Sequence, residues 1–424
     1  MYSQITPFRL EGFPKPLFAL SGLFLYVLAI LLSLIIGTVS SRSVLPREAS
    51  KTLCRCYPTD PCWPNATEWQ DFNQTLGGKL LATMPIASQC HHDAFAPFDA
   101  EACAKLRSAW FLDDTHYESS SSIMAPFFAN QSCDPFLPEN ARCIVGTYIQ
   151  YAVNASQASD YQKTIEFVQR YNIRLTIRNT GHDYNAKSTG AGAIGIWTHH
   201  LKRIDILDHK SSSYSGKAMR MGAGVQGFEA YKVAQTHGLV VVGGNCPTVG
   251  TAGGYTQGGG HGPLSSKFGL GADQVLEWEV VIASGEILRA TPTDNPDLYW
   301  ALSGGGGGTY GIVLSMTVKA YADMPTSASN LTFTNQVVSQ DAYYEVVGTF
   351  HEALIPIVDA GGVSVWQLTN TTFSMAPTYG PNISTAQMKS LLMPVIDKLD
   401  QYKFKYSTSI KSMWDVDIDL TDIQ

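Results

Sequence analysis

The sequence predicts an α+β fold, because segments of helical period and segments of strand period follow one another without a regular repeat. Apolar residues at positions 161, 165, 168 and 171 recur at the spacing of one helix face. Two apolar runs, 277–282 and 286–289, flank Ala283-Ser284-Gly285 and are typical of a β-hairpin. Residues 363–373 alternate as a strand does. Helices and antiparallel strands in one chain define the α+β class.

Local signals set the bounds of the other elements. Ser159-Asp160 are short polar residues before the first helix, so we expect them to cap its N-terminus. A strand is expected at 173–177 and a helix at 228–236, and Gly238 stands where a left-handed C-terminal cap belongs. A further helix is expected at 296–302.

Composition limits the class of protein. The chain has 424 residues, of which 45% are hydrophobic and 15% charged, so it can bury a large core and hold more than one domain. The net charge is -7 and no basic run stands out. Nucleic-acid binding therefore has no electrostatic footprint in this sequence.

An apolar segment lies near the N-terminus. Residues 17–36 are long enough to cross a bilayer, and no charged residue occurs from 16 to 41. A cleaved signal peptide is the alternative, because Val39-Ser40-Ser41 are small residues that a signal peptidase accepts. Both readings deliver the rest of the chain to the secretory pathway, either secreted or held at a membrane with its catalytic part lumenal or extracellular.

Cysteine usage agrees with that compartment. Seven of the eight cysteines fall between residues 54 and 143, as in a disulfide-bonded region, and their odd number leaves one to pair elsewhere or stay reduced. Cys54-Arg55-Cys56 is too closely spaced for the usual zinc ligands, so we expect no metal. N-glycosylation patterns begin at Asn65, Asn73, Asn130, Asn154, Asn330, Asn370 and Asn382.

Two short segments carry residues that suggest chemistry. Cys246 stands alone among the small residues 243–250, far from the other cysteines. His182 lies in the turn 178–184, directly after the expected strand. A buried apolar cysteine and a hydrogen-bonding histidine are the alternatives that the residues alone leave open. The histidines in His91-His92-Asp93 and His199-His200 show no ligand spacing and are expected to be structural.

Glycine clusters follow at 250–262 and 303–311. Such loops cost much backbone entropy when they become ordered, and they allow backbone N–H groups to approach a phosphate closely. A flexible linker is the alternative. The separate run 222–227 matches the G-x-G-x-x-G pattern of a dinucleotide site, but no acidic residue follows about 20 residues later, so we interpret it as a turn that begins a helix.

The histidine turn, the cysteine loop and the glycine clusters resemble the berberine bridge enzyme-like FAD-linked oxidoreductases of the vanillyl-alcohol oxidase/p-cresol methylhydroxylase superfamily. The resemblance covers about 144–324. It implies FAD as cofactor, with His182 bonded to the flavin 8α-methyl group and Cys246 to flavin C6. A depressed pKa of the Cys246 thiol is then expected during attachment. The resemblance further implies that the pyrophosphate and isoalloxazine contact Arg178, Asn179, Thr180, Gly181, Asp183, Gly250, Gly253, Gly254, Gly258, Gly259 and Gly260.

The same resemblance implies four regions and a reaction. The regions are the targeting segment 1–45, the cysteine-rich region 46–143, a p-cresol methylhydroxylase-type FAD-binding domain 144–324 and a substrate domain 325–424. The last is expected to be an incomplete antiparallel sheet, because relatives continue beyond it, and the catalytic base cannot be assigned. Gln367 and Thr369 are weak candidates for substrate contact, because they share a strand face.

The expected function is oxidation of a small organic substrate, a secondary metabolite, by hydride transfer to flavin N5 with molecular oxygen as acceptor. A carbohydrate oxidase and a truncated FAD-binding remnant without catalysis are the alternatives. The partners are thus the small-molecule substrate and oxygen, without nucleic acid, and a membrane if the N-terminal segment is not cleaved.

Overall fold

The computed structural model describes residues 54–92, 95–124 and 132–413. Except for Cys54, these residues belong to one compact unit, Arg55–Gln424. The expected membrane segment 17–36 lies outside the described residues. Within the described part of the chain, no helix has the length and apolar character needed to cross a membrane.

The first sheet joins residues from two of the regions expected from the sequence. Its strand order is β1-β2-β4-β3, in which β1 is antiparallel to β2 and the other pairs are parallel. Helices α2 and α5 pack against it through Trp69, Phe72 and Phe167. Residues 46–143 and 144–324 therefore share a core. The elements are α2 (Ala66–Thr75), β1 (Leu80–Ala82), β2 (Tyr151–Asn154), α5 (Ala158–Arg170), β3 (Arg174–Arg178) and β4 (Ala193–Trp197).

The predicted cap of α5 is wrong. The helix begins at Ala158 after Gln157, and no side chain caps it. Asp160 instead lies inside the helix with its side chain 1% exposed, paired with Lys79 at 2.8 Å. Its carboxylate also accepts the backbone N–H of Ser156 at 2.9 Å. Asp160 thus forms an ion pair with a lysine distant in the sequence instead of capping the helix.

The second sheet is antiparallel throughout, with strand order β5-β6-β10-β8-β9. The predicted hairpin is confirmed, since β8 and β9 are adjacent. Gly238 has φ +65°, which confirms the left-handed cap after α6. Trp278 lies fully buried in the core beneath the sheet. The elements are β5 (Ile204–Lys210), β6 (Ser215–Gly222), α6 (Gly227–Thr236), β8 (Val275–Val281), β9 (Ile287–Ala290), α8 (Pro296–Leu302) and β10 (Ile312–Lys319).

Short elements complete this region. Strands β7 and β11 pair with each other. Their bounds, and those of two short helices, are β7 (Leu239–Val240), α7 (Ser265–Phe268), η4 (Ala272–Gln274) and β11 (Tyr321–Ala322).

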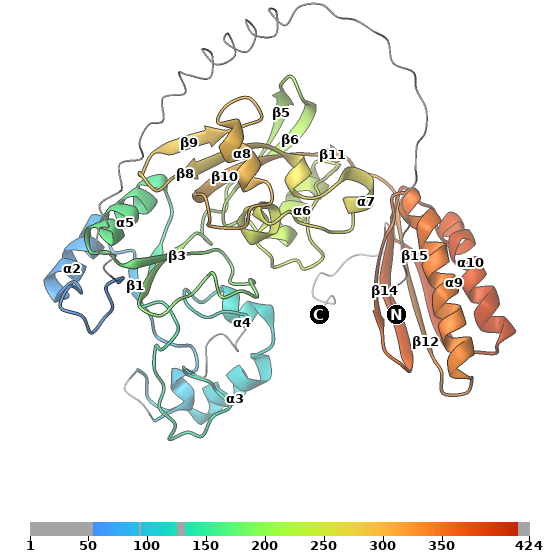
Figure 1. The fold of residues 1–424 in the computed structure, drawn as a ribbon, viewed down its shortest axis with the longest axis horizontal. Helices are drawn as coiled ribbons and strands as arrows, with labels where there is room; N and C mark the ends of the chain where they lie inside the picture. The colour runs from blue at the N-terminus through green and yellow to red at the C-terminus, as the bar shows by residue number, and fades with distance from the viewer. Residues whose placement is uncertain (1–53, 93–94, 125–131, 414–424) are drawn as a thin grey trace, which may run out of the picture. The chain divides into compact units, whose positions relative to one another are not determined.

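The third sheet has its own core. Its order is β13-β14-β12-β15, all antiparallel, and α9 and α10 pack side by side against it (Figure 1). Phe333, Phe350, Phe373 and Met388 are buried between helices and sheet. The elements are β12 (Thr326–Thr334), α9 (Gln340–Asp359), β13 (Val363–Leu368), β14 (Thr372–Pro381), α10 (Thr385–Gln401) and β15 (Tyr406–Ser412).

The prediction of one strand over 363–373 is wrong, because the segment is a hairpin. Strand β13 ends at Leu368 and β14 begins at Thr372. The Thr369 hydroxyl accepts the backbone N–H groups of Thr371 at 3.2 Å and Thr372 at 2.9 Å. Threonine side chains stabilise turns in this way, and alternation alone does not reveal it.

The cysteine-rich region contains η1 (Ser88–Cys90), α3 (Ala100–Ala109) and α4 (Asp113–Tyr117). Six of its seven cysteines form the disulfides Cys56–Cys62, Cys90–Cys103 and Cys133–Cys143. The seventh, Cys54, belongs to none of these three. His91 is structural as expected, because its two ring nitrogens bond to the carbonyl oxygens of Pro138 and Asp134.

Candidate functional site

The histidine loop begins at a buried arginine. Arg178 ends β3 and is fully buried, and its Nη2 donates to the carbonyl oxygens of His116 at 2.8 Å and Thr180 at 3.4 Å. Burial lowers the pKa of this guanidinium to about 10. Its Nε and Nη1 atoms are buried without a hydrogen-bond partner in the described part of the chain. Unsatisfied buried donors of this kind call for a further partner.

Gly181 makes the turn that presents His182. Its φ is +85°, and a Cβ atom there would lie 2.7 Å from Arg178 Nη1, so only glycine fits. Thr180 is buried. Asp183 accepts the backbone N–H of Lys187 and the hydroxyl of Ser188, and so holds the far side of the loop.

The structure brings His182 and Cys246 together. A ring nitrogen of His182, the sulfur of Cys246 and a carboxylate oxygen of Asp113 all lie within 4.8 Å of one another. Thr248 lies among them: its hydroxyl is 2.8 Å from His182 Nε2 and 3.3 Å from Cys246 Sγ. Asp113 Oδ2 accepts from Thr248 Oγ1 at 2.9 Å and from Cys246 Sγ at 3.1 Å. The four side chains form one hydrogen-bonded cluster.

The hydrogen bonding of Thr248 determines which ring nitrogen of His182 carries the proton. A hydroxyl has one proton, and Thr248 donates it to the Asp113 carboxylate, which can only accept. His182 Nε2 must therefore donate to Thr248 Oγ1. Burial lowers the pKa of His182, so the ring is neutral at pH 7 and Nδ1 keeps its lone pair.

The expectation of a depressed pKa for Cys246 is wrong for this structure. Burial raises the pKa of the thiol, hydrogen bonding with the side chain and backbone of Thr248 opposes the rise, and Asp113 adds to it. A carboxylate beside a thiol disfavours the thiolate because both are negative.

Sequence reasoning missed Asp113 and Thr248. Thr248 lies two residues after Cys246, and a polar residue so close to a candidate nucleophile was a usable signal. Asp113 gave none, because it stands 133 positions from Cys246, at the first residue of α4.

Asn179 connects the histidine loop to the first glycine cluster. Its Nδ2 donates to Thr198 Oγ1 at 3.1 Å and to the carbonyl oxygen of Ala223. Its Oδ1 is buried without a partner among the described residues. A Cβ atom on Gly250 would lie 1.9 Å from that oxygen, and one on Gly253 would lie 3.2 Å from the Asn179 side chain. These two glycines therefore make room for Asn179.

The first glycine cluster is ordered, so the linker alternative is wrong. Its central segment, η3 (Thr251–Tyr255), is a π-helical turn with a kink at Gly253, and Gly258 N donates to the carbonyl oxygen of Gly254 at 2.9 Å. Gly259 and Gly260 have φ +107° and +73°. A Cβ atom on Gly254 would meet no atom within 4 Å, so the loop leaves open space there.

Gln257 joins the two glycine clusters and was also missed. It is buried, and its carbonyl oxygen accepts from Gly304 N at 3.1 Å and Gly306 N at 2.8 Å. A Cβ atom on Gly307 would lie 3.1 Å from Gly254 Cα. Part of the glycine content is thus explained by backbone-to-backbone packing of the two loops.

The run 222–227 is a helix-start turn, as expected. It connects β6 to α6 within an antiparallel sheet, which is not the parallel unit of a dinucleotide site. Cβ atoms on Gly222 and Gly224 would lie 2.2 Å from the carbonyl oxygens of Leu201 and His199. Close approach of two backbone segments therefore explains these glycines.

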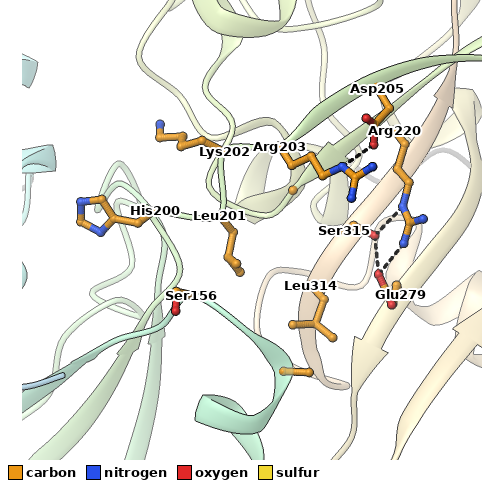
Figure 2. A pocket seen from close by; sticks show the side chains of 12 residues that line it. Ser156, His200, Leu201, Lys202, Arg203, Asp205, Arg220, Glu279, Leu314 and Ser315 are labelled. Atoms are coloured by element: carbon orange, nitrogen blue, oxygen red, sulfur yellow. Dashed lines mark hydrogen bonds and ion pairs between the residues drawn. The ribbon is translucent and has the colours of Figure 1, made fainter. Parts of the chain in front are cut away.

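A separate pocket of about 420 Å³ lies between the start of α5 and the second sheet (Figure 2). Charged side chains that line it form two ion pairs, Arg203 with Asp205 at 2.8 Å and Arg220 with Glu279 at 2.8 Å. Ser315 donates to Glu279 at 2.7 Å. None of the cluster residues lines this pocket.

The structure also shows where the substrate-contact candidates and the pair His199-His200 lie. Gln367 is exposed on β13, whereas Thr369 belongs to the turn after it, so the two do not share a strand face. His199 is buried and stacks on Trp197 at 5.7 Å, in keeping with a structural role. His200 bonds to Asn154 at 2.7 Å.

Asp113, His182 and Cys246 also meet the distance criterion for a metal site, but their side chains are already joined by hydrogen bonds through Thr248. Sequence spacing could not show this group, because its members come from three distant segments. The other acidic and cysteine group, Cys56, Asp60 and Cys62, is not free for a metal, since both of its cysteines are in a disulfide.

Comparison with known proteins identifies the family. The FAD binding domain family model matches residues 149–291. The FAD-linked oxidoreductase sthB of Phaeosphaeria nodorum is 42% identical over 286 residues, which are 67% of this chain and 91% of that protein. The chain belongs to the FAD-linked oxidoreductases.

The VAO-type fold is shared with a solved structure. The VAO-type flavoprotein MtVAO615 of Myceliophthora thermophila C1 superposes with a TM-score of 0.82 at 43% identity, over 85% of this chain and 66% of that one. The α+β prediction with a VAO-type FAD-binding domain is thereby confirmed. The narrower resemblance to berberine bridge enzymes stays a prediction.

Another relative of this FAD-linked oxidoreductase is sor8 of Hypocrea jecorina, 53% identical over 383 residues, which are 90% of this chain and 66% of that protein. The chain thus spans slightly less than two thirds of the length of this relative.

FAD is the cofactor of this family, and the residues present fit it. The unpartnered Arg178 donors, the unpartnered Asn179 Oδ1 and the open side of Gly254 lie on the loops that the sequence assigned to the cofactor.

Proposed function

We propose that this FAD-linked oxidoreductase holds its flavin through two covalent bonds, to His182 and to Cys246. The observation that carries the proposal is that a ring nitrogen of His182 and the sulfur of Cys246 lie within 4.8 Å of each other, although their loops are 64 positions apart. One ring system can meet both residues only if they lie close together.

The protonation state of His182 supports the first bond. Its Nε2 donates to Thr248, so the lone pair of the neutral ring is on Nδ1. A nucleophile needs such a lone pair. The buried surroundings that lower the pKa of His182 keep the ring neutral at physiological pH.

The loops 178–183 and 250–260 would bind the rest of the cofactor. Arg178 supplies a buried positive charge with two unpaired donors, and Asn179 an unpaired acceptor. Gly254 leaves room for a group against the backbone. We assign these residues to FAD contacts together with Thr180, Gly181, Asp183, Gly250, Gly253, Gly258, Gly259 and Gly260.

The reaction is oxidation of a small organic substrate, as in berberine bridge enzyme-like proteins. When bound, the flavin supplies hydride acceptance at N5 and delivery of electrons to molecular oxygen. The protein residues position the cofactor. We propose a secondary metabolite as the substrate class, with oxygen as the acceptor.

We further propose that the chain works in the secretory pathway or outside the cell. Three disulfides within residues 56–143 support this, because such bonds persist in oxidising compartments. The apolar segment 17–36 would direct the chain there, as a cleaved signal or a membrane anchor.

The test is to map flavin onto peptides of the full chain made in a secretory host. The protein is precipitated with acid, digested and analysed by mass spectrometry, with in-gel fluorescence as a parallel readout. We compare the natural chain with His182→Ala, with Cys246→Ala and with both changes together. His237→Ala, an exposed histidine at the end of α6, is the matched control.

Flavin on both the His182 and the Cys246 peptides of the natural chain is the expected result. Each single variant should retain flavin through the other residue, the double variant should lose it and the control should match the natural chain. Folded protein with acid-releasable flavin would contradict covalent attachment. Folded protein with bound zinc and no flavin would overturn the cofactor assignment as well.

A further inference from the structure

Asp113 contacts both the sulfur and the hydroxyl of the cluster through one oxygen. Its Oδ2 atom lies 3.1 Å from Cys246 Sγ and 2.9 Å from Thr248 Oγ1, and both donate to it. The side chain is 33% exposed, so its other face can exchange protons with water. Asp113 is the first residue of α4, in the region held by the disulfides.

The other groups near the thiol do not suit proton acceptance from it. The Thr248 hydroxyl keeps its proton and donates it in a hydrogen bond to Asp113. His182 donates to Thr248 through Nε2. Its other ring nitrogen is assigned to the first proposed flavin bond. Among the described residues, Arg178, Asp183, His116 and Tyr231 also interact electrostatically with the cluster, and the Cys246 thiol donates its hydrogen bond to none of them.

We propose that Asp113 is the base that accepts the Cys246 proton when the sulfur bonds to the flavin. This inference rests on the proposed bicovalent attachment. It assigns a residue of the cysteine-rich region to cofactor maturation.

The step balances with molecular oxygen as the oxidant. The Sγ–H bond breaks, the proton passes to Asp113 Oδ2, and the sulfur electron pair forms the new S–C bond. The flavin carbon loses its own proton, and the two electrons of the broken C–H bond are taken by oxygen. Two protons, two electrons and oxygen give hydrogen peroxide.

The test follows attachment to each residue separately. The full chain is produced flavin-free in a riboflavin-starved secretory host, mixed with FAD in air between pH 6 and 9, and quenched with acid at timed intervals. Peptides containing His182 and Cys246 are then quantified with and without flavin, after alkylation of free thiols. This readout does not depend on turnover.

Three variants separate charge from shape. Asp113→Asn keeps the side-chain size and an acceptor for Thr248, Asp113→Glu keeps the carboxylate, and Asp114→Asn removes the neighbouring exposed charge on the same helix turn. We expect Asp113→Asn to form the Cys246 bond about 100-fold more slowly at pH 7, in the range typical of general base catalysis. The loss should shrink as rising pH ionises the thiol directly, and the His182 bond should form normally.

Asp113→Glu should be faster than Asp113→Asn, and Asp114→Asn should match the natural chain. The inference is overturned if Asp113→Asn attaches Cys246 at the natural rate and pH dependence, or if Asn and Glu are equally slow. Flavin on His182 but never on Cys246 of the natural chain would overturn it too. Flavin on neither residue would remove the proposed function itself.

Discussion

The Thr248 hydroxyl donates to the Asp113 carboxylate across 2.9 Å, although the two residues are 135 positions apart. This bond orients the hydroxyl so that its oxygen faces His182 Nε2 and Cys246 Sγ. One hydrogen bond thereby sets the proton positions at both proposed tethers. Several properties of the cluster depend on it.

Thr248→Val should make Cys246 less reactive. The hydroxyl lowers the pKa of the thiol because it can turn its proton from Asp113 to the sulfur once the thiolate forms. Its loss should therefore raise that pKa further and reduce the thiolate fraction at pH 7. Thr248→Ser keeps the hydroxyl and should behave as the natural chain. The check is the rate of Cys246 alkylation against pH in flavin-free protein, resolved by peptide mass; equal profiles for valine and serine would contradict the expectation.

Gly250→Ala and Gly254→Ala should separate folding from cofactor binding. A Cβ atom on Gly250 would meet Asn179 Oδ1 at 1.9 Å, so that variant should lose stability even without flavin. Gly254 has open space at the same position, so its variant should fold normally but retain less FAD. Thermal unfolding of flavin-free protein, together with flavin content after reconstitution, measures both. Full flavin content in Gly254→Ala would show that the cofactor does not reach this glycine.

His199 should make stability depend on pH. Burial, with smaller contributions from Lys202 and His200, lowers its pKa to about 3 from the ordinary 6.5. The unfolded chain therefore binds a proton that the folded chain refuses between pH 6.5 and 3. The free energy of unfolding should be unaffected by His199 above pH 6.5 and fall by up to about 1.4 kcal/mol per pH unit below it.

His199→Phe keeps the stacking on Trp197 and removes that proton. Urea unfolding of both proteins between pH 4 and 7 should give a shallower decline for the variant. Parallel curves would mean that His199 takes up its proton in the folded state.

Removing the Cys90–Cys103 disulfide should cost more stability than removing Cys56–Cys62. The bonds close loops with sequence separations of 13 and 6, and loop entropy predicts about 3 and about 2 kcal/mol respectively. The comparison uses the two Cys→Ala double variants in urea unfolding. The reverse order would show that native packing, rather than chain entropy, dominates.

The sequence could predict the elements whose signals are local. The hairpin of β8 and β9, the left-handed Gly238 and helix α8 all follow from residues within a few positions of one another. The predicted cap of α5 was wrong because the Asp160 carboxylate bonds to Lys79, which lies 81 positions away in the sequence. The prediction of a single strand at 363–373 was wrong because the Thr369 side chain stabilises a turn within it.

Some residues of the candidate site could also be predicted from the sequence, and others could not. His182 and Cys246 stood out because they lie in glycine-rich turns, which have a high entropic cost of ordering. By itself the sequence determined the α+β class, and it marked the glycine-rich loops, His182 and Cys246 as candidates for FAD binding. Only the tertiary structure decided that Asp113 and Thr248 join them, and that the thiol is buried beside Asp113, which raises its pKa. The reason is that hydrogen bonds and desolvation depend on which distant segments meet, and no local pattern records that.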